Sequence, residues 1–282
     1  MANHTDAEAP KEQAPPRWTV WVDSLYRPFT HALESLGAYF YFTGQFFGWL
    51  VRPPYRISNT IDQMEFVGVG SLPIVLLVAF FTGAVFSLQT VDAARIYHGE
   101  VYVGMAVAVM LAREIAPVFA AIMVTARVGS GMATELGSMR ITEQIDALST
   151  LAVNPIQYLV VPRVVAATIM VPALTMAYNV VGLVGCYVIA VIVKDVDRGQ
   201  FMEYLTRYVD LNNYWHGLVK AVFFGFDLSI IACFQGYNAG GGAKGVGLAT
   251  TKSVVMGCVS ILIIDYLLTD IMMTLGIFQA VD

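Results

Sequence analysis

The sequence predicts an all-α membrane protein, with an amino-terminal interfacial amphipathic helix followed by five transmembrane helices. Of its 282 residues, 57% are hydrophobic and only 13% are charged, which is unlike a soluble domain. Several apolar runs reach the length of about 20 residues that a helix needs to cross a bilayer. A helically periodic stretch with early tryptophans precedes the first of these runs. Together these observations indicate a multi-pass membrane protein.

The amino-terminal part predicts a tail and then a helix that lies in the membrane interface. Residues 1–16 are polar and end in two prolines, so we expect a disordered cytosolic tail. Within residues 17–56, large apolar side chains recur at helical spacing, with charged residues mostly off that stripe: Trp18, Trp21, Val22, Leu25, Phe29, Leu33 and Leu36. Arg52-Pro53-Pro54 interrupts the pattern. We therefore assign residues 17–56 to an interfacial amphipathic helix region.

The rest of the chain, residues 57–282, is predicted to form one permease-like domain with five spans. The predicted spans are residues 66–90, 101–126, 164–193, 214–236 and 253–278. Pro73 and Pro172 are expected to kink the first and third spans. Gly182 and Gly185 offer a small surface for close contact between helices.

The distribution of Lys and Arg predicts the orientation. With the amino terminus in the cytosol, ten basic residues lie on the cytosolic side: Lys11, Arg17, Arg27, Arg52, Arg56, Arg127, Arg140, Arg163, Lys244 and Lys252. Four lie on the opposite side: Arg95, Lys194, Arg198 and Arg207. The positive-inside rule therefore favours a cytosolic amino terminus and, after five spans, a periplasmic carboxyl terminus.

The polar segment between the second and third spans, residues 127–163, is predicted to contain a short amphipathic helix at about 141–151. Its apolar positions share one helical stripe: Ile141, Ile145, Leu148 and Ala152. Glu143, Asp146 and Thr150 lie on another face, and Asn154-Pro155 is expected to end the helix. Such a helix on the cytosolic side suits docking into a groove of another protein, and it equally suits covering the ends of neighbouring helices.

Six charged residues lie within the predicted spans, of which Asp227 and Asp270 are expected nearer to helix ends: Arg113, Glu114, Lys220, Asp227, Asp265 and Asp270. Each such charge costs at least about 2.5–3.5 kcal/mol on insertion scales, so these side chains are expected to face the bundle interior or a cavity and to pair. Lys220 with Asp265, or Arg113 with Asp265, are both compatible with the sequence. The group is either a polar lining that senses a charged substrate headgroup or a structural ion pair that locks the bundle.

The sequence offers no catalytic, cofactor-binding or metal-binding motif. The glycine-rich segment 236–247 is not a phosphate-binding loop, because Lys244 is followed by Gly245 rather than by Ser or Thr. The four histidines are scattered and form no HExxH, and the three cysteines lie in apolar runs without ligand spacing. The net charge of −5 without a basic cluster argues against nucleic acid as a partner. We therefore predict a protein that is not itself an enzyme.

Two stretches resemble the signature of the MlaE/YrbE family, the permease subunits of MCE-type (Mla) ABC transporters. The first is AREIAPVFAAIMVTARVGSGMATELGSMRITEQIDALSTLAVNPIQYLVVPRVVA, and the second is GYNAGGGAKGVGLATTKSVV followed by a span with IDYLLTD. The resemblance covers about Ile61 to Thr274. It implies a homodimeric permease of the bacterial inner membrane that moves phospholipids between the inner and outer membranes and so maintains outer-membrane asymmetry.

The resemblance also implies partners and residue roles. A cytosolic ABC ATPase would bind beneath the permease, in some systems with a STAS-domain protein, and a periplasmic ring of MCE-domain subunits would sit above it. The residues that would form the coupling helix seated in the ATPase are Glu143, Gln144, Ile145, Asp146, Ala147 and Leu148. Arg113, Glu114, Lys220 and Asp265 match positions where similar proteins carry charges at the permease core.

Other functions remain compatible with the residues. An ion-coupled secondary transporter would use the intramembrane charges as a relay and would need no ATPase. An intramembrane enzyme acting on lipid would turn over without partners. Within the family resemblance itself, the cargo could be another hydrophobic molecule, such as a sterol or a solvent. Neither the first nor the second alternative requires an amphipathic helix in the cytosol.

Overall fold

The computed structural model describes residues 17–208 and 211–274, with the side chains of residues 33–207 and 211–274, and every regular element in this part of the chain is helical. Two compact units meet in sequence at Gly44 and Gln45. The first contains most of α1 (Arg17–Leu50), which ends six residues before the end of the predicted amphipathic region at residue 56. The predicted tail, residues 1–16, lies outside the described residues. All sites discussed below belong to the second unit.

The second unit contains five helices that are long and apolar enough to cross a membrane, as predicted. They span Ile57–Arg95, Glu100–Ile141, Ile156–Val193, Leu211–Tyr237 and Gly242–Thr274. The predicted fifth span continues to residue 278, and its last four residues lie outside the described part. A shorter helix, α8 (Arg198–Tyr208), follows the third span.

The first, fourth and fifth of these helices are single α-helices, and the other two are composites. The single ones are α2 (Ile57–Arg95), α9 (Leu211–Tyr237) and α10 (Gly242–Thr274). The second consists of η1 (Glu100–Tyr102), α3 (Val103–Met110), η2 (Leu111–Ile115), α4 (Ala116–Val124), η3 (Thr125–Gly129) and α5 (Ser130–Ile141). The third consists of η4 (Ile156–Val160), α7 (Val161–Tyr187) and η5 (Val188–Val193). Here η2, η3, η4 and η5 are π-helical turns, and η1 is a 3₁₀ turn.

The second span, which is the first of the two composite helices, runs about four turns beyond its predicted end at residue 126, up to Ile141. The sequence suggested a loop here because glycines and polar residues replace the apolar run. In the structure α5 packs against α9 and α10, and its glycine at Gly137 lies close to Ala239 and Val246. Tertiary packing therefore extends the helix through a segment of weak intrinsic helix propensity.

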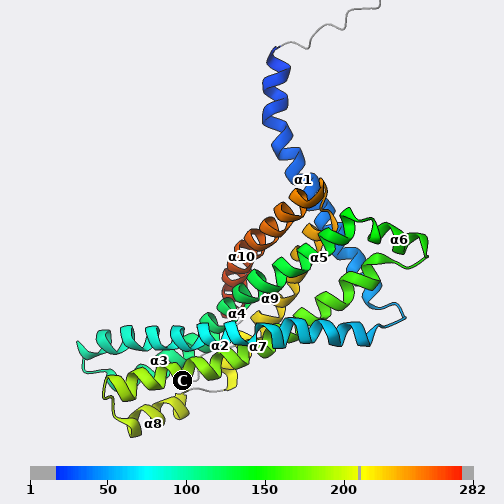
Figure 1. The fold of residues 1–282 in the computed structure, drawn as a ribbon. Coiled ribbons are helices and arrows are strands. Elements are labelled where there is room, and N and C mark those ends of the chain that lie inside the picture. The colour runs from blue at the N-terminus through cyan, green and yellow to red at the C-terminus, as the bar shows by residue number, and fades with distance from the viewer. Residues whose placement is uncertain (1–16, 209–210, 275–282) are drawn as a thin grey trace, which may run out of the picture. The chain divides into compact units, whose positions relative to one another are not determined.

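Helices α2 and α7 run parallel and in close contact over most of their length (Figure 1). A Cβ atom on Gly83 would lie 1.9 Å from the carbonyl oxygen of Gly182, and one on Gly185 would lie 2.2 Å from the carbonyl oxygen of Phe80. Only glycine allows backbones to approach so closely. The predicted close contact at Gly182 and Gly185 is therefore confirmed. Toward the far end of the pair, Lys194 Nζ lies 2.5 Å from Asp92 Oδ1.

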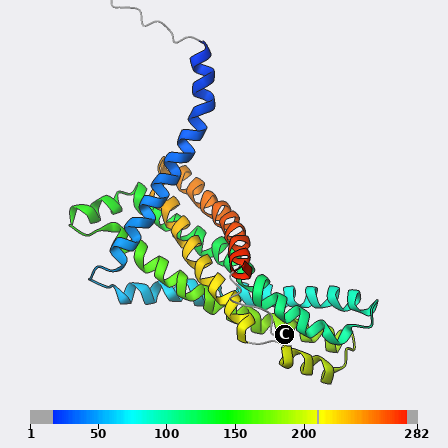
Figure 2. The ribbon, with the colours of Figure 1, turned by 180° about the vertical axis from the view of Figure 1, so that it is seen from behind.

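Helix α9 is the most enclosed of the five, and α4, α5, α7 and α10 all contact it (Figure 2). Three of its glycines lie against the backbones of its neighbours: Gly217 at Ala112, Gly225 at Ala167 and Gly236 at Ala133. A side chain at any of these positions would overlap a carbonyl oxygen. A polar side chain on the inner face of α9 is therefore surrounded by side chains of several other spans.

The predicted cytosolic helix exists but starts later and ends earlier than expected, as α6 (Gln144–Thr150). Ile141 belongs to the end of α5, because Glu143 adopts a left-handed conformation with φ of 59° that separates the two helices. Asn154 does not terminate α6. Its Oδ1 accepts hydrogen bonds from the backbone N–H groups of Ile156 and Gln157, so that Asn154 caps the following helix, with Pro155 in the first turn.

Candidate functional site

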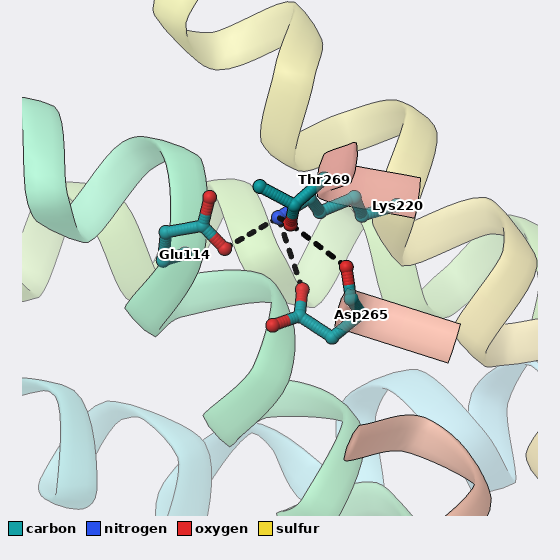
Figure 3. Close-up of polar contacts among 4 residues, drawn as sticks. All are labelled: Glu114, Lys220, Asp265 and Thr269. Atoms are coloured by element: carbon teal, nitrogen blue, oxygen red, sulfur yellow. Dashed lines mark hydrogen bonds and ion pairs between the residues drawn. The ribbon is translucent and has the colours of Figure 1, made fainter. Parts of the chain in front are cut away.

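Three membrane-spanning helices meet at one buried cation, Lys220 of α9 (Figure 3). Its Nζ donates to Glu114 Oε2, which lies on η2, and to Asp265 Oδ1 on α10 at 3.0 Å. The third partner is Thr269 Oγ1, also on α10, at 2.7 Å. The three N–H donors of the ammonium group thus match three acceptors. We refer to Glu114, Lys220, Asp265 and Thr269 as the charge cluster.

The charge cluster lies well inside the spans. Lys220 is about 14 Å along α9 from the start of that helix, at 1.5 Å per residue. Its side chain is only 1% exposed, so it has given up water for the three protein partners. A buried ammonium group is tolerated only when such partners replace its hydration. With both carboxylates ionised, the charge cluster carries a net charge of −1.

Arg113 is adjacent to Glu114 in sequence but has a different partner. Its Nε donates to Asn213 Oδ1 at 2.7 Å. Among the described residues Lys220, and not Arg113, is the cation paired with Asp265, which decides between the two pairings left open by the sequence. Both Arg113 and Glu114 lie on the π-helical turn η2, four and three residues before Pro117. Proline has no N–H to give to the preceding turn, so a widened turn is a natural local solution.

The charge cluster is closed on the side of α9 and open at the surface of the chain. The side chain of Glu114 is 42% exposed and that of Asp265 is 21% exposed, in contrast to Lys220. Next to Asp265, α10 exposes apolar side chains, among them Leu262 and Tyr266. A carboxylate that is exposed at membrane depth needs a polar cavity or a second protein surface in front of it. The geometry therefore marks this surface of the chain as the edge of a larger site.

A second polar region, residues 142–151, contains α6 and is called the α6 segment below. Of the predicted apolar stripe, Ile145 is 1% exposed and packs within its own chain, where α6 contacts α5. Ile141 and Ala152, at the two ends of the stripe, are exposed, so only the middle of the stripe is covered by its own chain. The residues that remain accessible are mostly polar: Thr142, Glu143, Gln144, Asp146, Ala147, Ser149, Thr150 and Leu151. Leu148 is half-buried.

One ion pair attaches the α6 segment to α5, and a second attaches α5 to the bundle. Arg140 Nη1 lies 2.6 Å from Asp146 Oδ1 and joins the end of α5 to α6. Arg163 Nη2 lies 3.0 Å from Glu135 Oε2 and joins α7 to α5, while its Nη1 donates to the carbonyl oxygen of Leu159. The exposed α6 segment is thus fixed to the end of the composite helix that also carries Glu114.

Thr269 and Asn213 were missed by the sequence analysis. Thr269 follows Asp265 by four residues, so it lies on the same helical face, and this spacing was a usable signal. Asn213 is polar at the start of a span, where polar residues are common, and nothing in the sequence distinguishes it. Its role depends on the packing of α9 against η2.

Comparison with known proteins places these features in a family. The sequence model of the family described as "Permease MlaE" matches residues 60–271. A "Probable ABC transporter permease protein" of Rickettsia felis is 41% identical over 238 residues, which cover 84% of this chain and 92% of the relative. The "Intermembrane phospholipid transport system permease protein MlaE" of Haemophilus influenzae is 35% identical over 234 residues, covering 82% and 90%. The chloroplastic "Protein TRIGALACTOSYLDIACYLGLYCEROL 1" of Arabidopsis thaliana is 32% identical over 266 residues, covering 94% and 74%.

Proposed function

Because the chain belongs to the MlaE permease family, we propose that it is the membrane subunit of an ABC transporter that carries phospholipid between the inner and outer bacterial membranes. The observation that carries this proposal is the charge cluster, which is buried at Lys220 and open at Glu114. A polar edge beside the apolar surface of α10 suits a molecule with a charged headgroup and acyl chains. The relative from Haemophilus influenzae is named for intermembrane phospholipid transport.

The proposed working unit is a homodimer. The exposed apolar side chains of α10 next to Asp265 would either face lipid or pack against a second copy, and a second copy would enclose the open side of the charge cluster. The resulting cavity would have apolar walls and a few charges for the headgroup. Arg113, close to this edge in sequence, would contribute a cation for the lipid phosphate.

The proposed source of energy is a separate ATPase that contacts the α6 segment from the cytosol. The accessible residues of this segment include Glu143 and Asp146 and no basic residue, so the complementary partner surface is basic. Glu143, Gln144, Asp146 and Ala147 would make direct contact, while Ile145 and Leu148 would hold α6 on the bundle. This division refines the role that the family resemblance implied for all six residues.

A continuous helical path connects the two regions. Glu114 and Ile141 lie on the same composite helix, 27 residues or about 40 Å apart. A push on α6 would pass through Arg140 and α5 along this helix to the charge cluster. The π-helical turns η2 and η3 lie on the path and are places where such a helix can change its geometry. ATP binding by the partner would then shift the bundle between two states of the lipid cavity.

The remaining proposed features follow the family. A periplasmic ring of MCE-domain subunits would receive or deliver the lipid on the opposite side, and a STAS-domain protein would bind with the ATPase in the cytosol. The amino terminus would be cytosolic and the carboxyl terminus periplasmic, as the distribution of basic residues predicts.

Transfer of fluorescent phospholipid between proteoliposomes tests the proposal directly. We expect transfer only when the permease, its ATPase, the MCE subunit and ATP are all present. Transfer driven by an ion gradient without the ATPase would instead establish a secondary transporter. Turnover of lipid by the purified chain alone would establish an enzyme.

A single exposed side chain tests the contact with the ATPase. Ala147→Arg places a cation on the accessible face of α6, and we expect at least about a tenfold loss of ATPase co-purification without loss of thermal stability. Ala93→Arg, at the far end of α2, is the matched control, because Ala93 is also exposed. Equal ATPase binding by both variants would contradict the proposed contact.

A further inference from the structure

A groove of about 400 Å³ lies where α1 ends, α2 begins and η4 leads into α7. It is separate from the charge cluster and shares no residue with it. Its apolar lining comes from the first turns of two spans, and includes Ile57, Ile61, Met64, Val161 and Val165. The groove is therefore located at one end of the helical bundle, and its lining includes Trp49 and Tyr55, two residue types that are enriched where spans meet the lipid headgroups.

Two arginines line the rim of this groove, and aromatic rings hold both of them in place. Arg52 Cζ lies 5.2 Å from the centre of the Trp49 ring, and Arg56 Cζ lies 4.3 Å from the centre of the Tyr158 ring. Gln157 Nε2 donates to the carbonyl oxygen of Arg52 at 2.7 Å, which ties the loop to the third span. A guanidinium that stacks on a ring keeps its N–H edge free for an anion.

Among the residues whose side chains are described, no carboxylate neutralises these two cations. Neither Arg52 nor Arg56 forms an ion pair with any described residue, and none of the described residues that line the groove is acidic. Two guanidinium groups without ion-pair partners, next to an apolar lining, match a molecule with an anionic head and a hydrocarbon tail. A volume of about 300–1,000 Å³ is typical of sites for small molecules, and this groove lies within that range.

We propose that this groove binds one anionic phospholipid of the surrounding leaflet, with its phosphate at Arg52 and Arg56 and the start of an acyl chain along α2 and α7. The bound lipid is a resident of the protein surface rather than the transported molecule, because the groove lies apart from the charge cluster. Its phosphate contacts the two arginines that follow α1 while its acyl chain contacts α2 and α7, so the bound lipid connects the end of α1 with two spans. The proposal rests on the membrane-spanning helices and does not depend on the proposed transport activity.

Trp49 itself provides a local probe for the test. In a chain with Trp18, Trp21 and Trp215 changed to Phe, Trp49 is the remaining tryptophan. The protein is reconstituted in mixed vesicles of phosphatidylglycerol and phosphatidylcholine, in which one lipid or the other carries brominated acyl chains that quench nearby tryptophan. We expect the apparent affinity at Trp49 to be at least about tenfold higher for phosphatidylglycerol, as two charge-assisted contacts would give.

The double change Arg52→Gln with Arg56→Gln should remove the preference for phosphatidylglycerol. Arg198→Gln, an exposed arginine at the start of α8, removes a charge elsewhere and should keep the preference. Equal quenching by the two lipids in the Trp49-only protein, or a preference that survives the double change, would overturn the proposal. Loss of the preference on adding glycerol phosphate at the same concentration as the lipid would also overturn the proposal, since the headgroup alone would then be sufficient for binding. A groove filled by another part of the chain or by a second copy would give no lipid preference and would overturn it too.

Discussion

The charge cluster and the α6 segment are two polar regions of this largely apolar chain, and they satisfy their charges in opposite ways. In the charge cluster Lys220 is buried and all three of its donors have protein acceptors. In the α6 segment Glu143 and Asp146 are exposed, and water is available to both. One region buries its cation within the bundle, and the other leaves its carboxylates exposed at the surface.

This difference predicts that substitutions in the two regions have different effects, although both regions look alike in the sequence, as charged residues in a largely apolar chain. Substitutions in the charge cluster should act on the stability of the bundle and on lipid transfer together, because the same contacts join three spans. Substitutions on the exposed face of α6 should act on partner binding alone. Ile145 is the exception within the α6 segment, since it is buried and should behave like a core residue.

Lys220→Met should have the largest effect. It leaves Glu114 and Asp265 facing one another without a cation, and breaking a buried pair in this way costs about 3–5 kcal/mol. We expect a large fall in the melting temperature of the purified protein and loss of lipid transfer. The triple change Glu114→Gln, Lys220→Met and Asp265→Asn removes all three charges and should recover most of the stability. A triple variant as unstable as Lys220→Met would show that packing, rather than charge, is what the lysine provides.

Ile145→Ala should have the next largest effect and should break the simple division between the two regions. Truncation of a buried isoleucine costs about 2–5 kcal/mol, so α6 should detach from α5 although no charge is altered. Hydrogen exchange of residues 142–151 measures this loss. Ala147→Ser, at an exposed position of the same helix, should leave the exchange rates unchanged. Unchanged exchange in Ile145→Ala would mean that the ion pair of Arg140 with Asp146 is sufficient to hold the α6 segment.

Glu114→Gln and Asp265→Asn should each have a smaller effect, because Lys220 keeps one carboxylate in either variant. We expect a loss of about 1–2 kcal/mol for Asp265→Asn, and less for Glu114→Gln, whose side chain is more exposed. Both changes together leave the lysine without a counter-charge, so the loss should exceed the sum of the single losses. Thermal unfolding of the two single variants and the double variant measures this. Additive losses would contradict the shared role of Lys220.

The helical architecture was predictable because it depends on the length and composition of the apolar runs. Five runs gave five long helices, and Gly182 and Gly185 gave the close contact of α7 with α2. The end of the second span was not predictable, since packing against α9 and α10 keeps residues 127–141 helical despite their polarity. The left-handed Glu143, which ends α5, carries no sequence signal of the kind that a glycine would give.

The candidate site was only partly predictable, for a related reason. The cost of intramembrane charges singled out Glu114, Lys220 and Asp265, and the structure brings these three together. It places Arg113 with Asn213 instead, because neighbouring positions on a helix point in different directions. The amphipathic stripe of α6 was recognised, but its spacing does not say whether the apolar face meets a partner or its own bundle. Ile145 faces its own bundle.

Arg140→Gln should have the smallest effect on stability, and it tests most directly whether the α6 segment is coupled to the charge cluster. Its partner Asp146 is exposed, and exposed ion pairs contribute about 0–1 kcal/mol, so the melting temperature should barely change. The same pair nevertheless lies on the proposed path from α6 to the composite helix. We therefore expect the ATPase to bind normally and lipid transfer per ATP hydrolysed to fall, because motion of α6 is transmitted less directly. Arg198→Gln, which removes an exposed charge from α8, should leave that ratio unchanged. Normal coupling in Arg140→Gln would mean that the push from α6 reaches α5 through the buried Ile145 contact alone.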